Sequence, residues 1–301
     1  MGKMSYWIKA IRLRTLPLSL ATIALGSMLA ASYDYHRWIL TVGAILTTIS
    51  LQVLSNLAND YGDSQNGADH FKRKGPERMV QAGRISMKEM YMAIVLFVII
   101  SFITGTWLCL EAFDWNTSRF WIFFLMLILC IYAAIKYTAG KNPYGYKALG
   151  DISVFIFFGL FGVAASFYLH SSILFWEVLL PAMSVGFLCM GVLNLNNMRD
   201  IPSDTEAGKV TIPILLGLQK AKIYHTILII LALLIGGLFV FLQDGPVEIF
   251  DFLFLLMSPL LIVHLIKIWQ INIHLDFDPL LKKLAIATLL FCLLFGAGQI
   301  L

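Results

Sequence analysis

The sequence contains nine apolar stretches, and each is about as long as a membrane crossing. A transmembrane helix needs roughly 20 apolar residues. Spanning segments must bond their backbone polar groups internally, and barrel strands would show only about ten residues of alternating polarity. We therefore predict an all-α polytopic membrane protein, with nine transmembrane helices in a bundle around a central cavity and a single membrane domain over residues 1–301. The predicted spans cover residues 16–33, 38–58, 90–112, 119–137, 151–170, 174–195, 223–242, 249–269 and 281–301.

Composition excludes a water-soluble protein. Hydrophobic residues make up 59% of the chain and charged residues only 13%, about half the charge of an ordinary soluble domain. The net charge of +4 arises from loops that would face an anionic lipid leaflet, so no nucleic-acid partner is expected. The four cysteines lie in or beside the apolar stretches, without disulfide or metal-ligand spacing. The six histidines are scattered and predict no metal site.

Basic residues are distributed unequally between the two sides of the predicted membrane. Of the 22 Lys and Arg residues, all but Arg37 and Arg119 lie at the N-terminus or in loops that follow even-numbered spans. The positive-inside rule then places the N-terminus and the central cavity's opening in the cytoplasm and the C-terminus outside. A basic start followed by an apolar run is also typical of a signal peptide. Arg14-Thr15-Leu16-Pro17 favours an interfacial helix that leads into a first span.

Two long loops on the predicted cytoplasmic side, 59–89 and 196–222, begin with acidic and amide residues and continue to basic ones. Residues i, i+4 and i+7 share one helix face, and the two sets have nearly this spacing. We expect Pro202 to open the helix between the acids of the second set. The sets are Asn56, Asp60 and Asp63 in the first loop, and Asn196, Asp200 and Asp204 in the second.

Carboxylates on one helix face repel one another unless a cation lies among them. These are hard oxygen ligands without His or Cys, which favours Mg²⁺ shared with a phosphate-bearing substrate. Arg78, Arg199 and Lys209 would supply further positive charge for a diphosphate. A solvated helix end rich in Asp and Asn is the simpler alternative. A cation transporter is a remote alternative, because a transporter would place its acidic residues near the bilayer midplane.

A third loop, 136–151, combines tyrosines and lysines with helix-breaking Gly and Pro. Aromatic and basic side chains beside a membrane can stack on a flat ring and hold an anion. Asp151 at the end of this loop is either part of such a site or a helix cap. The candidates here are Tyr137, Lys141, Tyr144, Tyr146 and Asp151.

Together, Asn59-Asp60-x-x-Asp63, Asp200-x-x-x-Asp204 and the nine predicted helices resemble the UbiA superfamily of membrane prenyltransferases, over nearly the whole chain. Four longer motifs resemble those of its 1,4-dihydroxy-2-naphthoate polyprenyltransferases, which act in menaquinone biosynthesis. These are Arg12-x-Arg14-Thr15-Leu16-Pro17, Asn56-x-x-Asn59-Asp60-Tyr61-x-x-Asp63, Pro143-Tyr144-Gly145-Tyr146-x-x-Leu149-Gly150-Asp151 and Asn197-x-Arg199-Asp200-x-x-x-Asp204-x-x-Ala207-Gly208-Lys209-x-Thr211.

The resemblance implies a bacterial inner-membrane enzyme that transfers a polyprenyl group from polyprenyl diphosphate to dihydroxynaphthoate, with decarboxylation, to give demethylmenaquinone. It implies that Asp60, Asp63, Asp200 and Asp204 are catalytic and bind Mg²⁺, supported by Asn56 and Asn197. It further implies that Arg78, Arg199 and Lys209 bind the diphosphate, and that Tyr137, Lys141, Tyr144, Tyr146 and Asp151 surround the acceptor. Another ring, such as 4-hydroxybenzoate or homogentisate, is the alternative acceptor. Prenyl chain length and oligomeric state stay open.

The sequence departs from the superfamily pattern at one position. The first motif often has a third Asp four residues after the second, but Gly67 stands there and Asp69 is the nearest acid. A Tyr-x-x-x-Lys element near the fourth span fits Tyr132 and Lys136, with Tyr137 as a competing register.

Overall fold

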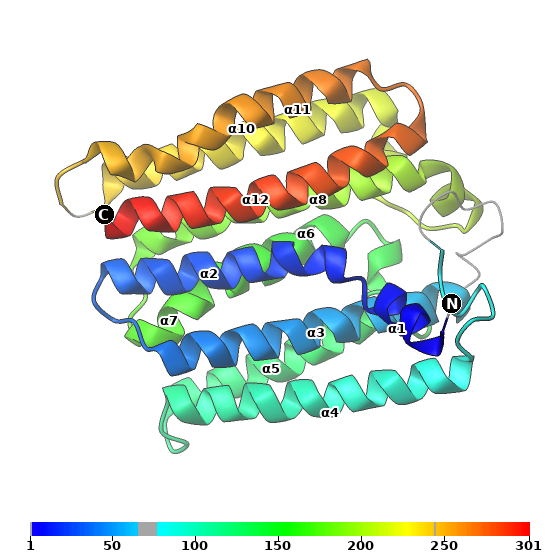
Figure 1. Ribbon diagram of the computed structural model, residues 1–301, viewed down its shortest axis with the longest axis horizontal. Helices are drawn as coiled ribbons and strands as arrows, with labels where there is room; N and C mark the ends of the chain where they lie inside the picture. Colours follow the sequence, from blue (N-terminus) through cyan, green and yellow to red (C-terminus); the bar gives the residue numbers. More distant parts are fainter. Residues whose placement is uncertain (1, 66–76, 244) are drawn as a thin grey trace. The chain divides into compact units, whose positions relative to one another are not determined.

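The computed structural model describes residues 2–65, 77–243 and 245–301. Over these residues the regular structure is helical, and nine helical segments are long and apolar enough to cross a membrane (Figure 1). The prediction of an all-α polytopic membrane protein is therefore confirmed. The α-helices are α1 (Lys3–Ile11), α2 (Leu16–Ser32), α3 (Trp38–Gln65), α4 (Met87–Ala112), α5 (Ser118–Lys136), α6 (Gly150–Val154), α7 (Ser166–Ser171), α8 (Leu179–Glu206), α9 (Ile212–Leu216), α10 (Leu218–Leu242), α11 (Ser258–Gln270) and α12 (Phe277–Ile300).

The described chain forms two compact units. Unit 1 consists of Met1–Leu16, Val42–Gly150 and Asp200–Thr211, and unit 2 consists of Pro17–Thr41, Asp151–Arg199 and Ile212–Leu301. Each unit has its own cluster of buried apolar side chains. Because α8 passes from unit 2 into unit 1 after Arg199, the polar end of this helix belongs to the unit that also contains the end of α3.

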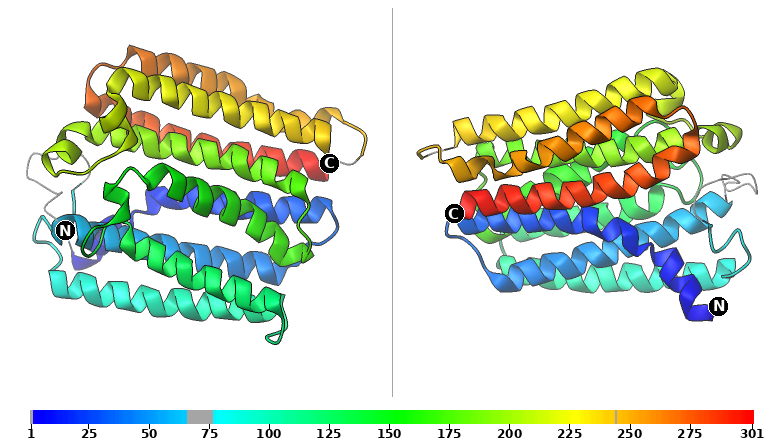
Figure 2. Two further views of the ribbon diagram at one scale, coloured as in Figure 1. Left: turned by 180° about the vertical axis from the view of Figure 1, so that it is seen from behind. Right: turned by 45° about the horizontal axis from the view of Figure 1, so that its top comes forward.

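In unit 1, α4 and α5 pack against each other along their length (Figures 1 and 2). Gly105 of α4 permits this approach, because a Cβ there would lie 2.3 Å from a methyl carbon of Leu127. The other side of α4 exposes apolar residues at helical spacing, which suits contact with lipid. These exposed residues are Met92, Leu96, Ile99 and Ile103.

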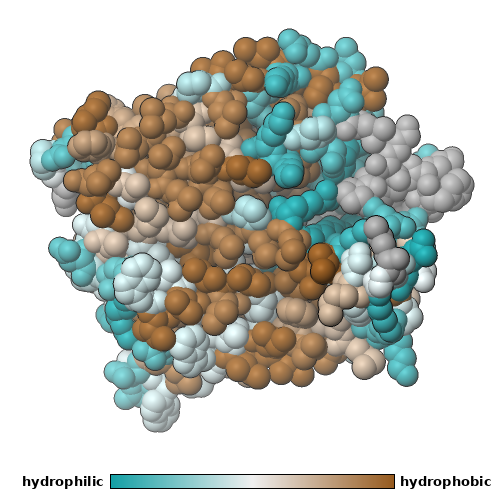
Figure 3. Space-filling model, in the orientation of Figure 1, coloured by the Kyte–Doolittle hydropathy of each residue, from teal (hydrophilic) through white to brown (hydrophobic). Residues whose placement is uncertain are grey.

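In unit 2, α12 packs along α11 and along the 3-10 helix Ile249–Met257 (Figure 2). Phenylalanines fill this contact, and the rings of Phe254 and Phe295 stack with centroids 4.7 Å apart. On α10, exposed apolar residues again recur at helical spacing, at Ile223, Ile227, Ile230 and Leu234. On the face shown in Figure 3, hydrophobic residues cover the middle portions of the helices.

The fifth predicted span contains α6, a π-helix over Phe155–Ala165, and α7. Glycines of this π-helix lie against other parts of unit 2. A Cβ on Gly159 would lie 2.8 Å from both the Ala182 carbonyl oxygen and the Gly186 Cα, and one on Gly162 would lie 2.5 Å from the Thr22 hydroxyl oxygen. The wide turn of the π-helix, and the absence of a Cβ at these two glycines, therefore allow close backbone packing.

Two helices continue past their apolar spans, and the loops predicted from residues 59 and 196 begin later. α3 runs to Gln65 and α8 to Glu206, so both acidic motifs lie on helical extensions. The expectation that Pro202 opens the helix is wrong, since α8 continues through it. Proline cannot donate to the carbonyl four residues earlier. That carbonyl, on Met198, instead lies 2.8 Å from the Nδ1 atom of His274.

Candidate active site

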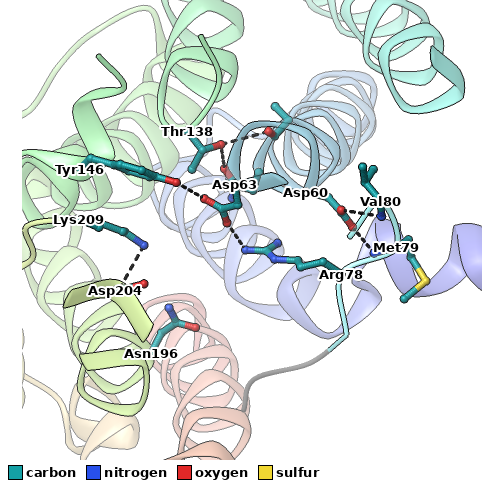
Figure 4. Close-up of polar contacts among 12 residues, drawn as sticks. Asp60, Asp63, Arg78, Met79, Val80, Thr138, Tyr146, Asn196, Asp204 and Lys209 are labelled. Atoms are coloured by element: carbon teal, nitrogen blue, oxygen red, sulfur yellow. Dashed lines mark hydrogen bonds and ion pairs between the residues drawn. The ribbon is translucent and has the colours of Figure 1, made fainter. Parts of the chain in front are cut away.

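The first carboxylate of the α3 extension is held by backbone amides. The Asp60 side chain is buried and accepts hydrogen bonds from the amides of Met79, at 2.9 Å, and Val80, at 3.1 Å (Figure 4). These amides are presented by a compact turn in which the Ala82 amide donates to the Arg78 carbonyl oxygen, at 3.0 Å. Asp60 therefore fixes the position of Arg78, which begins this turn.

Asp63 lies one turn further along α3 and is held by two side chains. Its Oδ2 atom forms an ion pair with the Arg78 guanidinium, and its Oδ1 atom accepts a hydrogen bond from the Tyr146 hydroxyl at 2.8 Å (Figure 4). Both Asp63 and Arg78 are buried. A charge-assisted pair between buried groups is geometrically specific. Asp63 is thus positioned by one cation, Arg78, and by one neutral hydrogen-bond donor, Tyr146.

Gly62, between these acids, allows α3 to approach the loop that follows α5. A Cβ on Gly62 would lie 2.5 Å from the carbonyl carbon and oxygen of Thr138. The Thr138 hydroxyl in turn lies 2.8 Å from the Asn59 side-chain oxygen. The loop containing Tyr146 is therefore attached directly to the acidic end of α3.

The second motif is organised by the end of α8. Gly208 adopts a positive φ of 68°, a backbone conformation that glycine favours at helix ends. The chain then turns back, so that the Lys209 amide donates to the Asp204 carbonyl oxygen at 2.9 Å and the Lys209 Nζ atom lies 3.3 Å from Asp204 Oδ2. The Gly-Lys pair of the sequence motif thus places a cation on the acid before it.

Burial lowers the pKa of the Lys209 ammonium, but the nearby carboxylates outweigh this effect and raise that pKa above its ordinary value of 10.5. Asp204 contributes most, followed by Asp63 and Asp200. The acids of both motifs therefore act on one lysine. Lys209 and these three carboxylates all belong to unit 1.

A short backbone link joins the Tyr146 loop to the segment after α8. The Val210 amide donates to the Tyr146 carbonyl oxygen at 3.1 Å, and the Ala148 amide donates to the Val210 carbonyl oxygen at 2.9 Å. Lys147 and Val210 form an isolated parallel β-bridge. The Lys209 Nζ atom also lies 5.5 Å from the centre of the Tyr146 ring. The loop over 143–148 therefore contacts both acidic motifs.

Among the other predicted acceptor residues, the structure brings Tyr137 and Tyr144 together. Their ring centroids are 5.4 Å apart, and the Tyr144 hydroxyl donates to the Ala133 carbonyl oxygen at 3.0 Å. Lys141 is exposed in the same loop. Asp151 belongs to unit 2, where the Tyr224 hydroxyl donates to its Oδ1 atom at 3.0 Å. Nothing in the sequence identified Tyr224 as a partner of Asp151.

Two further predicted residues, Asn56 and Arg199, have structural partners of their own. The Asn56 amide donates to the Ile11 carbonyl oxygen, at 2.8 Å, and to the Thr15 hydroxyl, at 2.9 Å. Arg199 pairs with Asp278 at the start of α12. Asn197 is buried in α8. Asp69, Lys72, Arg73 and Lys74 lie outside the described residues.

A magnesium ion fits the donors of the acidic motifs. Over residues 2–65, 77–243 and 245–301, no three His, Cys, Asp or Glu side chains gather closely enough to hold a metal ion by themselves. Mg²⁺ does not require this, since it is usually bound by one or two carboxylates together with water and substrate phosphates. Asp60, Asp63, Asp200 and Asp204 supply only hard oxygen donors, so each motif suits one such ion.

Comparison with known proteins identifies close relatives. A protein described as 1,4-dihydroxy-2-naphthoate octaprenyltransferase from Haemophilus influenzae is 41% identical over 301 residues, covering 99% of this chain and 97% of the relative. A protein of the same description from Escherichia coli is 39% identical over 293 residues, covering 97% of this chain and 94% of the relative.

Solved structures give the same fold. A UbiA homolog from Archaeoglobus fulgidus bound to GPP and Mg²⁺ is 18% identical and matches with a TM-score of 0.69, covering 98% of this chain and 99% of the homolog. At 18% identity, this match shows a shared fold alone. The model of the UbiA prenyltransferase family matches residues 19–280. The chain, with its two acidic helix ends in one unit, belongs to the UbiA prenyltransferase family.

Proposed function

We propose that this protein transfers a polyprenyl group from polyprenyl diphosphate to 1,4-dihydroxy-2-naphthoate. The observation that carries the proposal is the 41% and 39% identity, over nearly the whole chain, to two proteins described as octaprenyltransferases for this acceptor. The grouping of acids and cations in unit 1 supports a diphosphate donor. Both relatives are described as octaprenyltransferases, which favours a long prenyl chain in the donor substrate of this protein.

The donor half of the reaction uses the acidic motifs. Asp60, Asp63, Asp200 and Asp204 would hold Mg²⁺, and bound Mg²⁺ would neutralise the charge that develops on the departing diphosphate. Arg78 and Lys209 already lie at these carboxylates and can turn to phosphate oxygens. The allylic carbon–oxygen bond breaks, and its electron pair leaves with the diphosphate. Cations placed at that oxygen lower the barrier to ionisation.

The acceptor half needs an electron-rich ring next to the prenyl cation. A ring carbon attacks the cation and then loses its proton, which restores aromaticity. The carboxylate leaves as carbon dioxide, and a proton takes its place on the ring. The product is the prenylated hydroquinone, whose two-electron oxidised form is demethylmenaquinone. Tyr137, Lys141 and Tyr144, all in unit 1, are proposed to orient the acceptor's hydroxyl and carboxylate groups. The acceptor role that the motif gives Asp151 stays a prediction. Excluding water from the cation prevents simple hydrolysis of the donor.

Mass spectrometry of the product tests the proposal. Membranes containing the protein are supplied with Mg²⁺, octaprenyl diphosphate and either dihydroxynaphthoate or 4-hydroxybenzoate. We expect prenylated, decarboxylated naphthoquinol from the first acceptor and little product from the second. Preferential prenylation of 4-hydroxybenzoate would assign another acceptor, and the absence of any prenylated product would refute the transferase activity.

We also propose that the N-terminus and the acidic motifs face the cytoplasm, where soluble enzymes would supply the acceptor. The concentration of 20 of the 22 basic residues on one side supports this orientation. In a variant without native cysteines, Gln65→Cys and Thr205→Cys should react with an impermeant thiol reagent only after cells are opened. Asn116→Cys should react in intact cells. All three positions are exposed, and labelling of position 65 or 205 in intact cells would reverse the orientation.

A further inference from the structure

Tyr146 resembles an acceptor contact in the sequence, because it lies in an aromatic loop beside Tyr144. Its side chain, however, lies among the charged groups of the donor half (Figure 4). The hydroxyl donates to Asp63 on α3, and the ring lies under the ammonium of Lys209 beyond α8. One side chain therefore contacts a carboxylate of the first motif and a cation of the second.

The two partners of Asp63 differ in a way that matters for binding. Arg78 contacts Oδ2 as a cation, whereas Tyr146 contacts Oδ1 as a neutral hydroxyl. An incoming diphosphate attracts the guanidinium strongly, because the two form charge-assisted hydrogen bonds. The phenol has no comparable attraction to it. Arg78 can therefore transfer to phosphate while Tyr146 keeps the Asp63 carboxylate in place.

The ring of Tyr146 has a second role. A cation over an aromatic face is attracted by the ring, and the Lys209 Nζ atom lies 5.5 Å from the ring centre. The backbone of the same residue accepts from the Val210 amide at 3.1 Å. The position of Lys209 thus depends on the ring and on the backbone link, besides its ion pair with Asp204.

We propose that Tyr146 is a positioning residue for the diphosphate and its metal ion, rather than a contact of the aromatic acceptor. The inference rests on the proposed prenyl-transfer function. It assigns the hydroxyl to the orientation of Asp63 and the ring to the orientation of Lys209. Removing either should weaken binding of the donor substrate even when no acceptor is present.

The test is calorimetric binding of geranyl S-thiolodiphosphate, a poorly ionising analogue, to the purified full chain with Mg²⁺ and without acceptor. Tyr146→Phe removes the hydroxyl and keeps the ring. A hydrogen bond to a charged group supports an expected loss of about tenfold in affinity. Tyr146→Leu also removes the ring, and a further loss of about threefold is expected. Tyr91→Phe, at an exposed tyrosine of α4, is the matched control and should bind as the wild type does.

Steady-state kinetics separate positioning from acceptor contact. In Tyr146→Phe the KM for prenyl diphosphate and the Mg²⁺ concentration for half-maximal rate should both rise about tenfold, while the KM for naphthoate stays unchanged. If Tyr146→Phe bound the donor analogue as tightly as the wild type but had a raised KM for naphthoate, the inference would be overturned. Tyr146 would then be assigned to the acceptor site. Equal binding by the Phe and Leu variants would overturn the role of the ring. Failure of the wild type to bind the analogue would instead refute the proposed function, and the inference with it.

Discussion

The polar ends of α3 and α8 carry similar motifs but are held in different ways. On α3, Asp60 accepts two backbone amides and Asp63 is held by Arg78 and Tyr146. On α8, Asp204 pairs with Lys209, which lies five residues further along the same segment. The first motif is therefore held by residues distant in the sequence, whereas the Asp204–Lys209 pair of the second forms within one turn and is supported by the Tyr146 ring and the Val210 backbone link.

This difference separates two tasks within one site. Long-range contacts reduce the freedom of the α3 carboxylates before any substrate arrives, which lowers the entropic cost of binding. The Gly208 turn leaves Lys209 attached by one ion pair, one ring and a backbone link. We infer that α3 provides the more rigid half and that the segment after α8 provides the half that adapts to the diphosphate.

The largest expected effect comes from removing a carboxylate. Asp60→Asn and Asp200→Asn should each reduce turnover by roughly 100-fold or more, as loss of a preorganised charged group commonly does. Asp60→Asn should additionally loosen the turn at Met79 and Val80, because an amide offers one acceptor oxygen where the carboxylate uses two. Rate assays and thermal unfolding would measure these effects. Comparable unfolding midpoints for the two variants would contradict the difference between the helix ends.

A smaller effect is expected from exchanging the two cations. Arg78→Lys should raise the KM for prenyl diphosphate about tenfold, because a lysine cannot reproduce the planar fork of a guanidinium. Lys209→Arg should be tolerated better, since the contact of Lys209 with Asp204 needs only a single nitrogen donor, which a guanidinium also offers. Parallel donor-substrate titrations of both variants provide the comparison. A larger loss in Lys209→Arg than in Arg78→Lys would show that the α8 end is the more exacting half.

Substitutions of Arg199 test whether this residue contributes to stability or to diphosphate binding. Because it is buried and pairs with Asp278, which is 44% exposed, Arg199→Ala should lower the free energy of unfolding by about 1 kcal/mol. Asp278→Asn should produce part of the same loss, and a double-mutant cycle would measure the coupling. The KM for prenyl diphosphate should change little in either variant. A raised KM in Arg199→Ala alone would make Arg199 a diphosphate ligand, as its motif predicts.

The smallest effect concerns pH. The folded-state pKa of Lys209 is raised above 10.5 by nearby carboxylates despite burial. Its contribution to stability is therefore fully present below pH 10.5, the ordinary pKa that the lysine has in the unfolded chain, and is lost as pH rises through the folded-state pKa. Between pH 6 and 9, Lys209→Met should differ from the wild type by a constant free energy of unfolding. A difference that shrinks within that range would show that Lys209 titrates there.

The helical fold could be predicted because hydropathy reports burial in lipid directly. Each predicted span corresponds to a helical segment long enough to cross a membrane. The ends of α3 and α8 could not be predicted, since their polar turns are stabilised by tertiary contacts rather than by apolar periodicity. Pro202 illustrates the same limit. The sequence indicates a broken helix, but His274, far along the chain, contacts the carbonyl that the proline leaves without a donor.

Within the site, acids and cations were identified from local motifs, whereas their pairing was not. The hydrogen bond from Tyr146 to Asp63 joins residues 83 positions apart, and no spacing rule predicts such a contact. The histidines show a similar case. His225 and His264 appear unrelated in the sequence, yet their Nε2 atoms lie 3.1 Å apart between α10 and α11.

Magnesium-dependent binding of geranyl S-thiolodiphosphate to the wild type, Asp63→Asn and Asp204→Asn tests most directly whether both helix ends form one donor site. If one diphosphate is shared, each variant should lose roughly 100-fold in affinity, and the double variant should lose little more, because ligands of a shared site are not additive. Wild-type affinity in either single variant would place the diphosphate at one helix end and contradict the account.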